Sequence, residues 1–398
     1  MEMKALQQRL QSIDVFRAIT MFLMIFVNDF DGVENVPEWI KHAKASEDAL
    51  GFADTIFPAF LFILGLSIPI ALKNRIKRGQ TQAQILVYIF LRGLALLIMG
   101  FFHVNLENYG STALLPQPIW EILITVAFFL IWIDYPQTVK KTMRYSLQGL
   151  GIVILIAMAF LYKGEDQNHL FVPMQPQWYG ILGLLGWSYL VCAPVYLLSN
   201  GRIWIQFLAW LFFFSFSVGE HAGFLHSLNP VHQYVWIVGS GSMPAFTMAG
   251  VAVCVLYKKM IGENKINVLW LLLTGFGLLN ILLGFLTRPL GGISKIHDTP
   301  AWIGICTGLS ILAYIVVIYL IDIRQKKKWF DIIKPAGTTT LVCYLIPYIL
   351  YSLYEITRLH FPKFLNESWG GFFRSVITSL VIIQMAGWLE KRQIRLKI

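Results

Sequence analysis

The chain has 398 residues, of which 57% are hydrophobic and only 14% are charged, and its mean hydropathy is +0.62. A soluble domain carries about 25% charged residues, so this composition excludes a disordered chain, a secreted disulfide scaffold and an ordinary soluble enzyme. A net charge of +10 would favour nucleic acid as the partner of a soluble protein. In a chain this apolar, basic loops on one side of a membrane explain the charge, so no nucleic-acid partner is expected.

Apolar runs of about 20 residues, the length that crosses a bilayer as a helix, recur from one end of the sequence to the other. We therefore expect one all-α domain over residues 1–398, a polytopic transmembrane helix bundle with about twelve spans and no fewer than about ten. The run at 115–133 is the weakest, because it contains Pro116, Pro118 and Glu121. The expected spans are 14–32, 52–72, 84–102, 115–133, 145–162, 178–198, 202–219, 233–257, 266–286, 300–321, 333–354 and 371–389.

Lysine and arginine are concentrated in every second loop between these spans, for example at 73–78, 258–265, 324–334 and 391–397. Because basic loops stay on the cytoplasmic side, the pattern predicts cytoplasmic termini and a multi-pass protein of the cytoplasmic (inner) membrane, in direct contact with the lipid bilayer. The eight histidines all fall in or beside loops of the opposite side. Any proton-transfer chemistry is therefore expected near the outer face.

The sequence offers little for a metal site. All four cysteines lie within apolar runs, so neither a disulfide framework nor a cysteine cluster is indicated. His221, His226 and His232 could bind a metal, but their spacing suits a loop poorly and the sequence supports them with Glu220 alone. We expect no metal.

Ionisable side chains inside a span are costly to bury, and the densest group of them surrounds the first two spans. Asp14 and Arg17 are three residues apart, so they share a face of a helix and can pair at its cytoplasmic end. That pair could simply stabilise the start of the helix, or it could serve an anionic ligand at the cytoplasmic mouth. Asn28 ends the first span at the outer boundary, where helix capping would also explain it.

Asp54 opens the second span in a strongly apolar run and follows a loop that carries His42. A carboxylate that orients an imidazole fixes the tautomer that a catalytic histidine needs, so the two residues could form such a pair. Alternatively, Asp54 could stabilise a helix N-terminus and His42 could be a solvated loop residue. Beside the tenth span, Lys295 and His297 follow two glycines, and the lysine could meet an anionic or hydroxylated ligand.

Several stretches resemble one family of membrane proteins. The opening segment carries SIDVFR at 12–17, FVN at 26–28, KHA at 41–43 and FADTIFPAFLFILG at 52–65, and TPAW at 299–302 and LVCYLIP at 341–347 follow later. Together they resemble the membrane acyltransferases typified by heparan-alpha-glucosaminide N-acetyltransferase, in particular a bacterial branch of N-acetylglucosamine-related membrane proteins. The resemblance runs from about residue 12 to residue 390, and its opening motif is the most specific part.

This resemblance implies a transmembrane acyltransferase that moves an acetyl group from cytosolic acetyl-CoA to the amine of an extracytoplasmic amino sugar or glycan. By motif, His42 matches the family's catalytic histidine, and Asn28 and Asp54 match its Asn and Asp. Imidazole suits either of two roles, as the base that takes the amine proton or as a carrier of the acyl group. Asp54 would orient His42, and Asn28 would donate to the developing oxyanion.

Other expectations rest on charge or on the resemblance. The phosphates of acetyl-CoA are expected at the basic cytoplasmic mouth, where Arg17 and Asp14 are candidate contacts, while Lys295 and His297 are candidate contacts for the acceptor. A homodimer is implied by the resemblance alone. The alternative function is a secondary transporter of a sugar or glycan fragment, which about twelve spans with both ends inside also suit.

Overall fold

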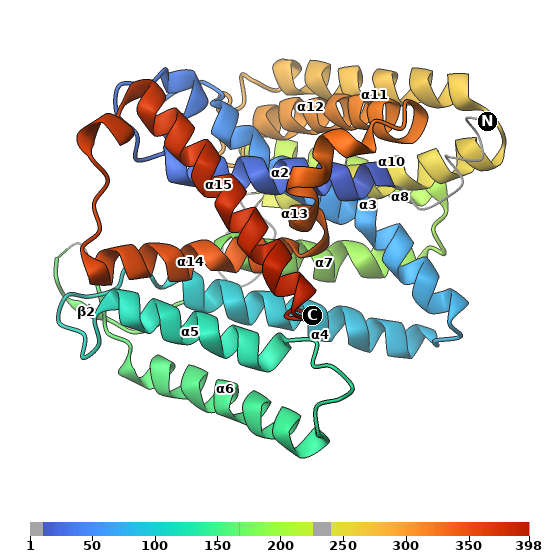
Figure 1. Cartoon of the computed structure of the whole chain (residues 1–398). Coiled ribbons are helices and arrows are strands. Elements are labelled where there is room, and N and C mark those ends of the chain that lie inside the picture. The colour runs from blue at the N-terminus through green and yellow to red at the C-terminus, as the bar shows by residue number, and fades with distance from the viewer. Residues whose placement is uncertain (1–10, 167, 226–239, 398) are drawn as a thin grey trace.

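A computed structural model describes residues 11–166, 168–225 and 240–397 (Figure 1). In these ranges the regular structure is helical, apart from a small antiparallel hairpin of β1 (Gly164–Glu165) and β2 (Phe171–Val172). The all-α bundle predicted from the sequence is therefore confirmed.

Long helices follow each of the expected apolar runs, with their ends shifted by a few residues. They are α2 (Gln11–Phe30), α3 (Ile56–Lys77), α4 (Gln82–Val104), α5 (Gln117–Trp132), α6 (Lys141–Leu161), α7 (Gly180–Leu198), α8 (Ile203–His221), α10 (Ser242–Gly262), α11 (Ile266–Leu286), α12 (Pro300–Ile318), α14 (Thr340–Thr357) and α15 (Ser368–Lys391). Shorter turns are the 3-10 segments η1 (Glu38–Ile40), η2 (Phe52–Thr55), η6 (Lys327–Ile333) and η7 (Lys363–Leu365), the π-helical η5 (Tyr319–Ile323) and α13 (Lys334–Thr338).

In the described part of the chain, 10 helices are long and apolar enough to cross a membrane, which makes this a multi-pass membrane protein. Two long helices lie outside that set. Helix α5 has only 16 residues, in agreement with the weakness of its run, and the other is α2, which carries Asp14, Arg17 and Asp29. A total of twelve spans and the cytoplasmic location of both termini stay predictions.

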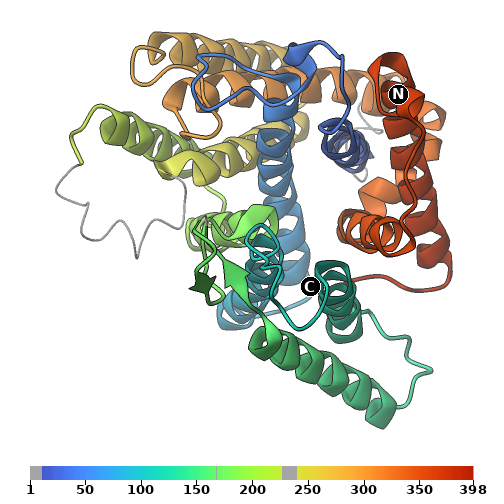
Figure 2. The same cartoon turned by 90° about the vertical axis from the view of Figure 1, so that its left-hand side faces the viewer.

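Helices α3 and α10 form the centre of the bundle, and their backbones touch. A Cβ atom at Gly65 would collide with the carbonyl oxygen of Thr247, and one at Gly250 would collide with that of Phe62. Small residues at such contacts let helices pack by close backbone approach, the usual basis of helix association in membranes. Figure 2 shows α3 running through the middle, with α11 and α12 at the top and α4, α5 and α6 below.

Three expected runs have different boundaries in the structure. The run 333–354 is divided at Thr339 into α13 and α14, because α13 packs separately against α2, where Gly337 meets the Asp14 backbone. The run 300–321 ends in the π-helical turn η5, where Asp322 accepts the backbone N–H of Ser12 at 3.3 Å. Helix α10 begins at Ser242, and residues 233–239 of its expected run lie outside the described ranges.

Two loops meet at one end of the bundle, on the left of Figure 1. One connects α2 to α3 and the other connects α11 to α12. The Asp48 carboxylate of the first loop accepts the backbone N–H of Ile293 at 2.6 Å and the Nε–H of Arg288 at 2.8 Å. In the opposite direction, His297 Nε2 donates to the carbonyl oxygen of Ala45 at 3.2 Å. These contacts bring the loop carrying His42 beside the loop carrying Lys295.

Candidate active site

Asp54 lies in the η2 turn that leads into α3, and only 3% of its side chain is exposed. Its Oδ1 lies 2.6 Å from His42 Nδ1, while its Oδ2 accepts the backbone N–H groups of Ala43 at 3.0 Å and Gly51 at 3.1 Å. A carboxylate oxygen can only accept, so Nδ1 of His42 carries the proton and donates it. The structure thus places the two side chains in direct contact.

Glycine at position 51 makes this contact sterically accessible. A Cβ atom at Gly51 would collide with the carbonyl oxygen of Lys41, so the side chain of any other residue would push the loop away. With glycine there, residues 41–43 lie directly against the start of η2. This close approach brings the Ala43 N–H group and the His42 ring to the Asp54 carboxylate.

The α11–α12 loop adds a positive charge. Lys295 Nζ lies 3.4 Å from His42 Nδ1 and 4.0 Å from Asp54 Oδ1. Burial lowers the pKa of Lys295, although the carboxylates of Asp54 and Asp298 act in the opposite direction. From α12, Trp302 Nε1 donates to the backbone carbonyl of Asp54 at 3.1 Å, which fixes η2 against that helix. Three segments of the chain therefore hold one buried carboxylate.

Asp298 lies between the same loop and the start of α12, and the sequence analysis did not select it. Burial raises the pKa of Asp298 to about 7, while a hydrogen bond with Ser242 and the charges of His221 and Lys295 act against that rise. A signal was available, because an acidic residue directly follows Lys295 and His297 and precedes an apolar helix. Asp48 was also missed, and its exposed loop setting carries no such signal.

His42 keeps its second ring nitrogen open. Within the described ranges no residue is a hydrogen-bond partner of Nε2, and 34% of the side chain is exposed. In the neutral ring, the proton that is donated to Asp54 lies on Nδ1, and the lone pair therefore lies on Nε2. Such a nitrogen can take a proton from an incoming nucleophile or attack an acyl carbon itself.

His297 and Asn28 have other surroundings. The His297 ring donates to the Ala45 carbonyl, and the His297 carbonyl lies 3.0 Å from His221 Nε2, so this residue joins loops to each other. Asn28 lies in the last turn of α2 with an exposed side chain. No hydrogen bond in the described part of the protein connects it to His42 or Asp54. The roles predicted for His297 and Asn28 stay predictions.

Asp14 and Arg17 lie near the other end of α2, within a network of hydrogen bonds. Arg17 Nη1 donates to Asp14 Oδ1 at 3.2 Å and to the Gly337 carbonyl at 3.0 Å, and Nη2 donates to Ser67 Oγ at 2.7 Å. These bonds connect α2 with α3 and α13. They give Arg17 a clear structural task, and its predicted contact with acetyl-CoA stays a prediction.

The described ranges contain no group of three His, Cys, Asp or Glu side chains that could bind a metal ion. Of the three histidines considered from the sequence, His226 and His232 lie outside those ranges. The expectation that no metal is bound therefore stays a prediction.

Fold and site together define a multi-pass helical membrane protein with a buried carboxylate, a histidine and a lysine gathered at one end. The chain belongs to the family described as Domain of unknown function (DUF5009), whose profile matches residues 9–237, a range that includes His42 and Asp54. Membership in this group confirms the resemblance drawn from the opening motifs.

The chain is also similar to two named mammalian enzymes. It is 39% identical over 108 residues to the heparan-alpha-glucosaminide N-acetyltransferase of Homo sapiens, and the aligned region covers 27% of this chain and 15% of that protein. It is 36% identical over 102 residues to the enzyme of the same name from Mus musculus, and the aligned region covers 25% of this chain and 14% of that protein. The match thus spans a small part of either relative, and the assignment to a bacterial branch stays a prediction.

Proposed function

We propose that the protein is a transmembrane acyltransferase that moves an acetyl group from acetyl-CoA to the amine of an amino sugar or glycan. The observation that carries this proposal is the contact of 2.6 Å between Asp54 and His42, which leaves Nε2 of the imidazole without a partner in the described structure. Similarity to two heparan-alpha-glucosaminide N-acetyltransferases supports the reaction class.

Two routes use the same nitrogen. In the direct route, the neutral amine attacks the thioester carbon, Nε2 takes the amine proton, and the thiolate that leaves receives that proton from the imidazolium. In the carrier route, Nε2 attacks the thioester carbon and the C–S bond breaks, so CoA leaves as its thiolate and an acyl-imidazolium remains. The amine then attacks that acyl carbon, the bond to Nε2 breaks, and the amine proton passes to the freed Nε2 and from there to the thiolate. Both routes start from the tautomer that the Asp54 contact imposes on His42.

Neighbouring residues supply charge and orientation. Asp54 keeps Nδ1 protonated and stabilises the imidazolium that forms when Nε2 takes a proton. The Lys295 ammonium, beside both side chains, would stabilise the negative oxygen of the tetrahedral intermediate. Asn28 is proposed as a second donor to that oxygen, and His297 as a residue that places the Lys295 loop near the acceptor.

The proposal includes a direction across the membrane. It places both termini in the cytoplasm, the protein in the cytoplasmic membrane, and His42 near the outer face, as the distribution of basic loops favours. Acetyl-CoA would then bind with its phosphates at the basic end that carries Asp14 and Arg17. A homodimer is compatible with this arrangement and stays a prediction.

The test is an acetyl-transfer assay with purified protein, labelled acetyl-CoA and glucosamine. Wild type is compared with His42→Ala and with His360→Ala, a matched control because His360 is an exposed loop histidine. We expect labelled N-acetylglucosamine from the wild type and the control, and a loss of about 10³-fold in His42→Ala. Equal activity in all three proteins would contradict the role of His42. Intact-protein mass spectrometry distinguishes the routes, since only the carrier route adds an acetyl group to the protein.

The secondary transporter is the competing hypothesis. A transporter site is expected where helices break near the middle of the bilayer. Helix α13 ends at Thr338, so the break at Thr339 lies near the start of its apolar run and gives the transporter no specific support. Absence of both acetyl transfer and CoA binding in all three proteins would reject the acyltransferase and favour transport.

A further inference from the structure

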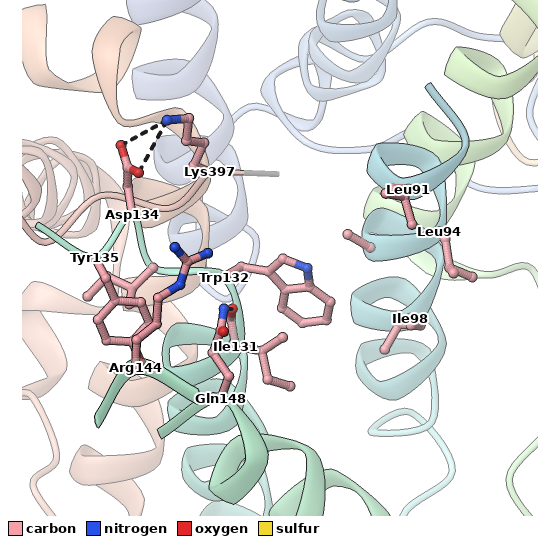
Figure 3. A pocket seen from close by; sticks show the side chains of 12 residues that line it. Leu91, Leu94, Ile98, Ile131, Trp132, Asp134, Tyr135, Arg144, Gln148 and Lys397 are labelled. Atoms are coloured by element: carbon pink, nitrogen blue, oxygen red, sulfur yellow. Dashed lines mark hydrogen bonds and ion pairs between the residues drawn. The ribbon is translucent and has the colours of Figure 1, made fainter. Parts of the chain in front are cut away.

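A groove of about 370 Å³ lies at the end of the bundle opposite to the His42 loop, where α4, α5, the start of α6 and the C-terminal segment meet (Figure 3). It forms because α5 ends at Trp132 and the C-terminal segment, residues 395–397, pairs with residues 132–134. Lys397 donates its backbone N–H to the Trp132 carbonyl at 2.9 Å, and Asp134 donates to the Arg395 carbonyl at 2.7 Å.

The two walls of the groove have opposite chemistry. On α4 the wall is apolar and consists of Leu91, Leu94 and Ile98, with 57% of Leu91 and 38% of Leu94 exposed. Because α4 is one of the helices long and apolar enough to span a membrane, we expect this exposed wall to face the hydrocarbon of the bilayer. Across from it, Arg144 and Lys397 supply two cations at the edge of the apolar region (Figure 3).

These two cations differ in how they are compensated. Lys397 Nζ lies 3.2 and 3.4 Å from the two carboxylate oxygens of Asp134. The Arg144 guanidinium extends into the groove between Trp132 and that ion pair, as Figure 3 shows. Throughout the described ranges it has neither a hydrogen bond to an acceptor side chain nor an ion pair. The groove therefore combines an apolar wall with one uncompensated positive charge.

We propose that this groove binds an anionic phospholipid of the leaflet on the C-terminal side. The phosphate would lie against Arg144, since a guanidinium forms paired hydrogen bonds with phosphate oxygens. One acyl chain would lie along Leu91, Leu94 and Ile98. A zwitterionic lipid brings its own cation to the headgroup, so the single free guanidinium selects for net negative charge. Trp132 at the rim suits the interface, where tryptophan is enriched in membrane proteins.

The occupant follows from the position of the groove. Exposed apolar side chains of α4, a helix apolar enough to cross a membrane, form one wall, so a molecule that reaches the groove from the membrane would bring both an acyl chain and a headgroup. Binding would connect α4 and α6 with the C-terminal segment, whose backbone pairs with residues 132–134 at the end of α5. This lipid site is independent of the reaction proposed for His42.

The test measures lipid retained by the full-length protein in native mass spectrometry. Protein is taken from nanodiscs of phosphatidylcholine alone or of phosphatidylcholine mixed with phosphatidylglycerol. We expect wild type to retain phosphatidylglycerol preferentially, and Arg144→Gln to lower that preference about tenfold. Lys141→Gln is the matched control, because Lys141 is an exposed cation at the start of the same helix and lies outside the groove. It should retain the wild-type preference.

Two further measurements keep the proposal falsifiable. Leu94→Trp fills the apolar wall and should lower retention of both lipids together, while added inorganic phosphate should not displace phosphatidylglycerol from the wild type. Equal losses in Arg144→Gln and Lys141→Gln would mean general surface charge and would overturn the proposal. Equal retention of the two lipids by the wild type would also overturn it.

Discussion

Two polar clusters along α3 differ in what their functional groups do. Asp54 and Ser67 are separated by roughly 20 Å of helix. Around Ser67, both terminal nitrogens of Arg17 donate to acceptors within the protein, so the cluster connects helices. Around Asp54, every carboxylate oxygen is used, yet the His42 Nε2 has no partner in the described ranges. The hydrogen bonds around Ser67 are all made within the protein, as expected of a cluster that holds helices together. Around Asp54, Nε2 of His42 has no such partner in the described structure, as expected of an atom that reacts with a substrate.

Among the variants that test this difference between the two clusters, Asp54→Asn should lower the rate of acetyl transfer most. An amide in that position can still accept the Ala43 and Gly51 N–H groups, but it no longer provides an anion that holds Nδ1 of His42 protonated. We expect kcat for acetyl transfer to fall about 10³-fold with little change in thermal stability. Asp166→Asn is the control, since Asp166 also accepts backbone N–H groups in an exposed loop. Unchanged kcat in Asp54→Asn would remove the basis for calling the cluster catalytic.

The charge of Lys295 is testable by a pH profile. Lys295→Gln should lower kcat/KM about 10²-fold at neutral pH if the ammonium stabilises an oxyanion. Burial lowers the pKa of Lys295 from 10.5, so the wild type should lose activity on the alkaline side before an ordinary lysine would deprotonate. Lys295→Arg keeps its charge there and should move the alkaline limb to higher pH. An identical alkaline limb in wild type and Lys295→Arg would exclude this lysine as its cause.

Gly51→Ala should disturb the loop without changing any reacting group. The new Cβ would meet the Lys41 carbonyl, so residues 41–43 must move and the His42 ring with them. We expect kcat to fall about tenfold, since small displacements of a catalytic group are costly. Gly149→Ala, where a Cβ would meet nothing within 4 Å, should leave kcat unchanged. If the two variants behave alike, the tight approach at Gly51 is not needed for the site.

Arg17→Gln distinguishes the structural from the ligand-binding role at the second cluster. Loss of the bonds to Gly337 and Ser67 should lower the free energy of unfolding by about 1–3 kcal/mol. A structural residue would leave KM for acetyl-CoA unchanged in the fraction that remains folded, whereas a phosphate contact would raise it. Chemical denaturation and steady-state kinetics on the same preparation separate the two outcomes.

Asp48→Asn should give the smallest effect. The amide can still accept the Ile293 N–H, so only the charge opposite Arg288 is lost, and both side chains of that ion pair are about half exposed. We expect kcat to change by no more than about twofold, with less difference at high salt. A large loss would show that the two loops depend on this single ion pair for their alignment.

The helices were largely predictable because a span is a local property of the sequence. About 20 apolar residues form a helix whatever surrounds them, so runs such as 266–286 and 300–321 were placed within a few residues. Interruptions were not predictable, because the break at Thr339 depends on how Gly337 packs against α2. Likewise, the end of α12 in a π-helical turn depends on a contact with Ser12 far along the chain.

The candidate site was predictable in its parts and not in its assembly. Sequence pattern and resemblance selected His42, Asp54 and Lys295 separately, and no spacing rule states that Lys295 approaches both others. That approach depends on loop contacts made by Asp48 and by the backbone of Ala45. Such contacts involve ordinary polar residues in loops, which leave no periodic signal in the sequence.

Contacts at Asp54 join the start of α3 to α12, and this has a consequence for how the protein is made. A chain is synthesised from its N-terminus, so η2 and α3 reach the membrane well before Lys295 and Trp302 are made. Until then, the nascent chain holds a carboxylate at the edge of an apolar segment without its later counter-charge, which is unfavourable in a bilayer. We therefore expect the candidate site to be completed late, after insertion of α12, and truncated chains to be recognised by cellular quality control because Asp54 still lacks Lys295 and Trp302.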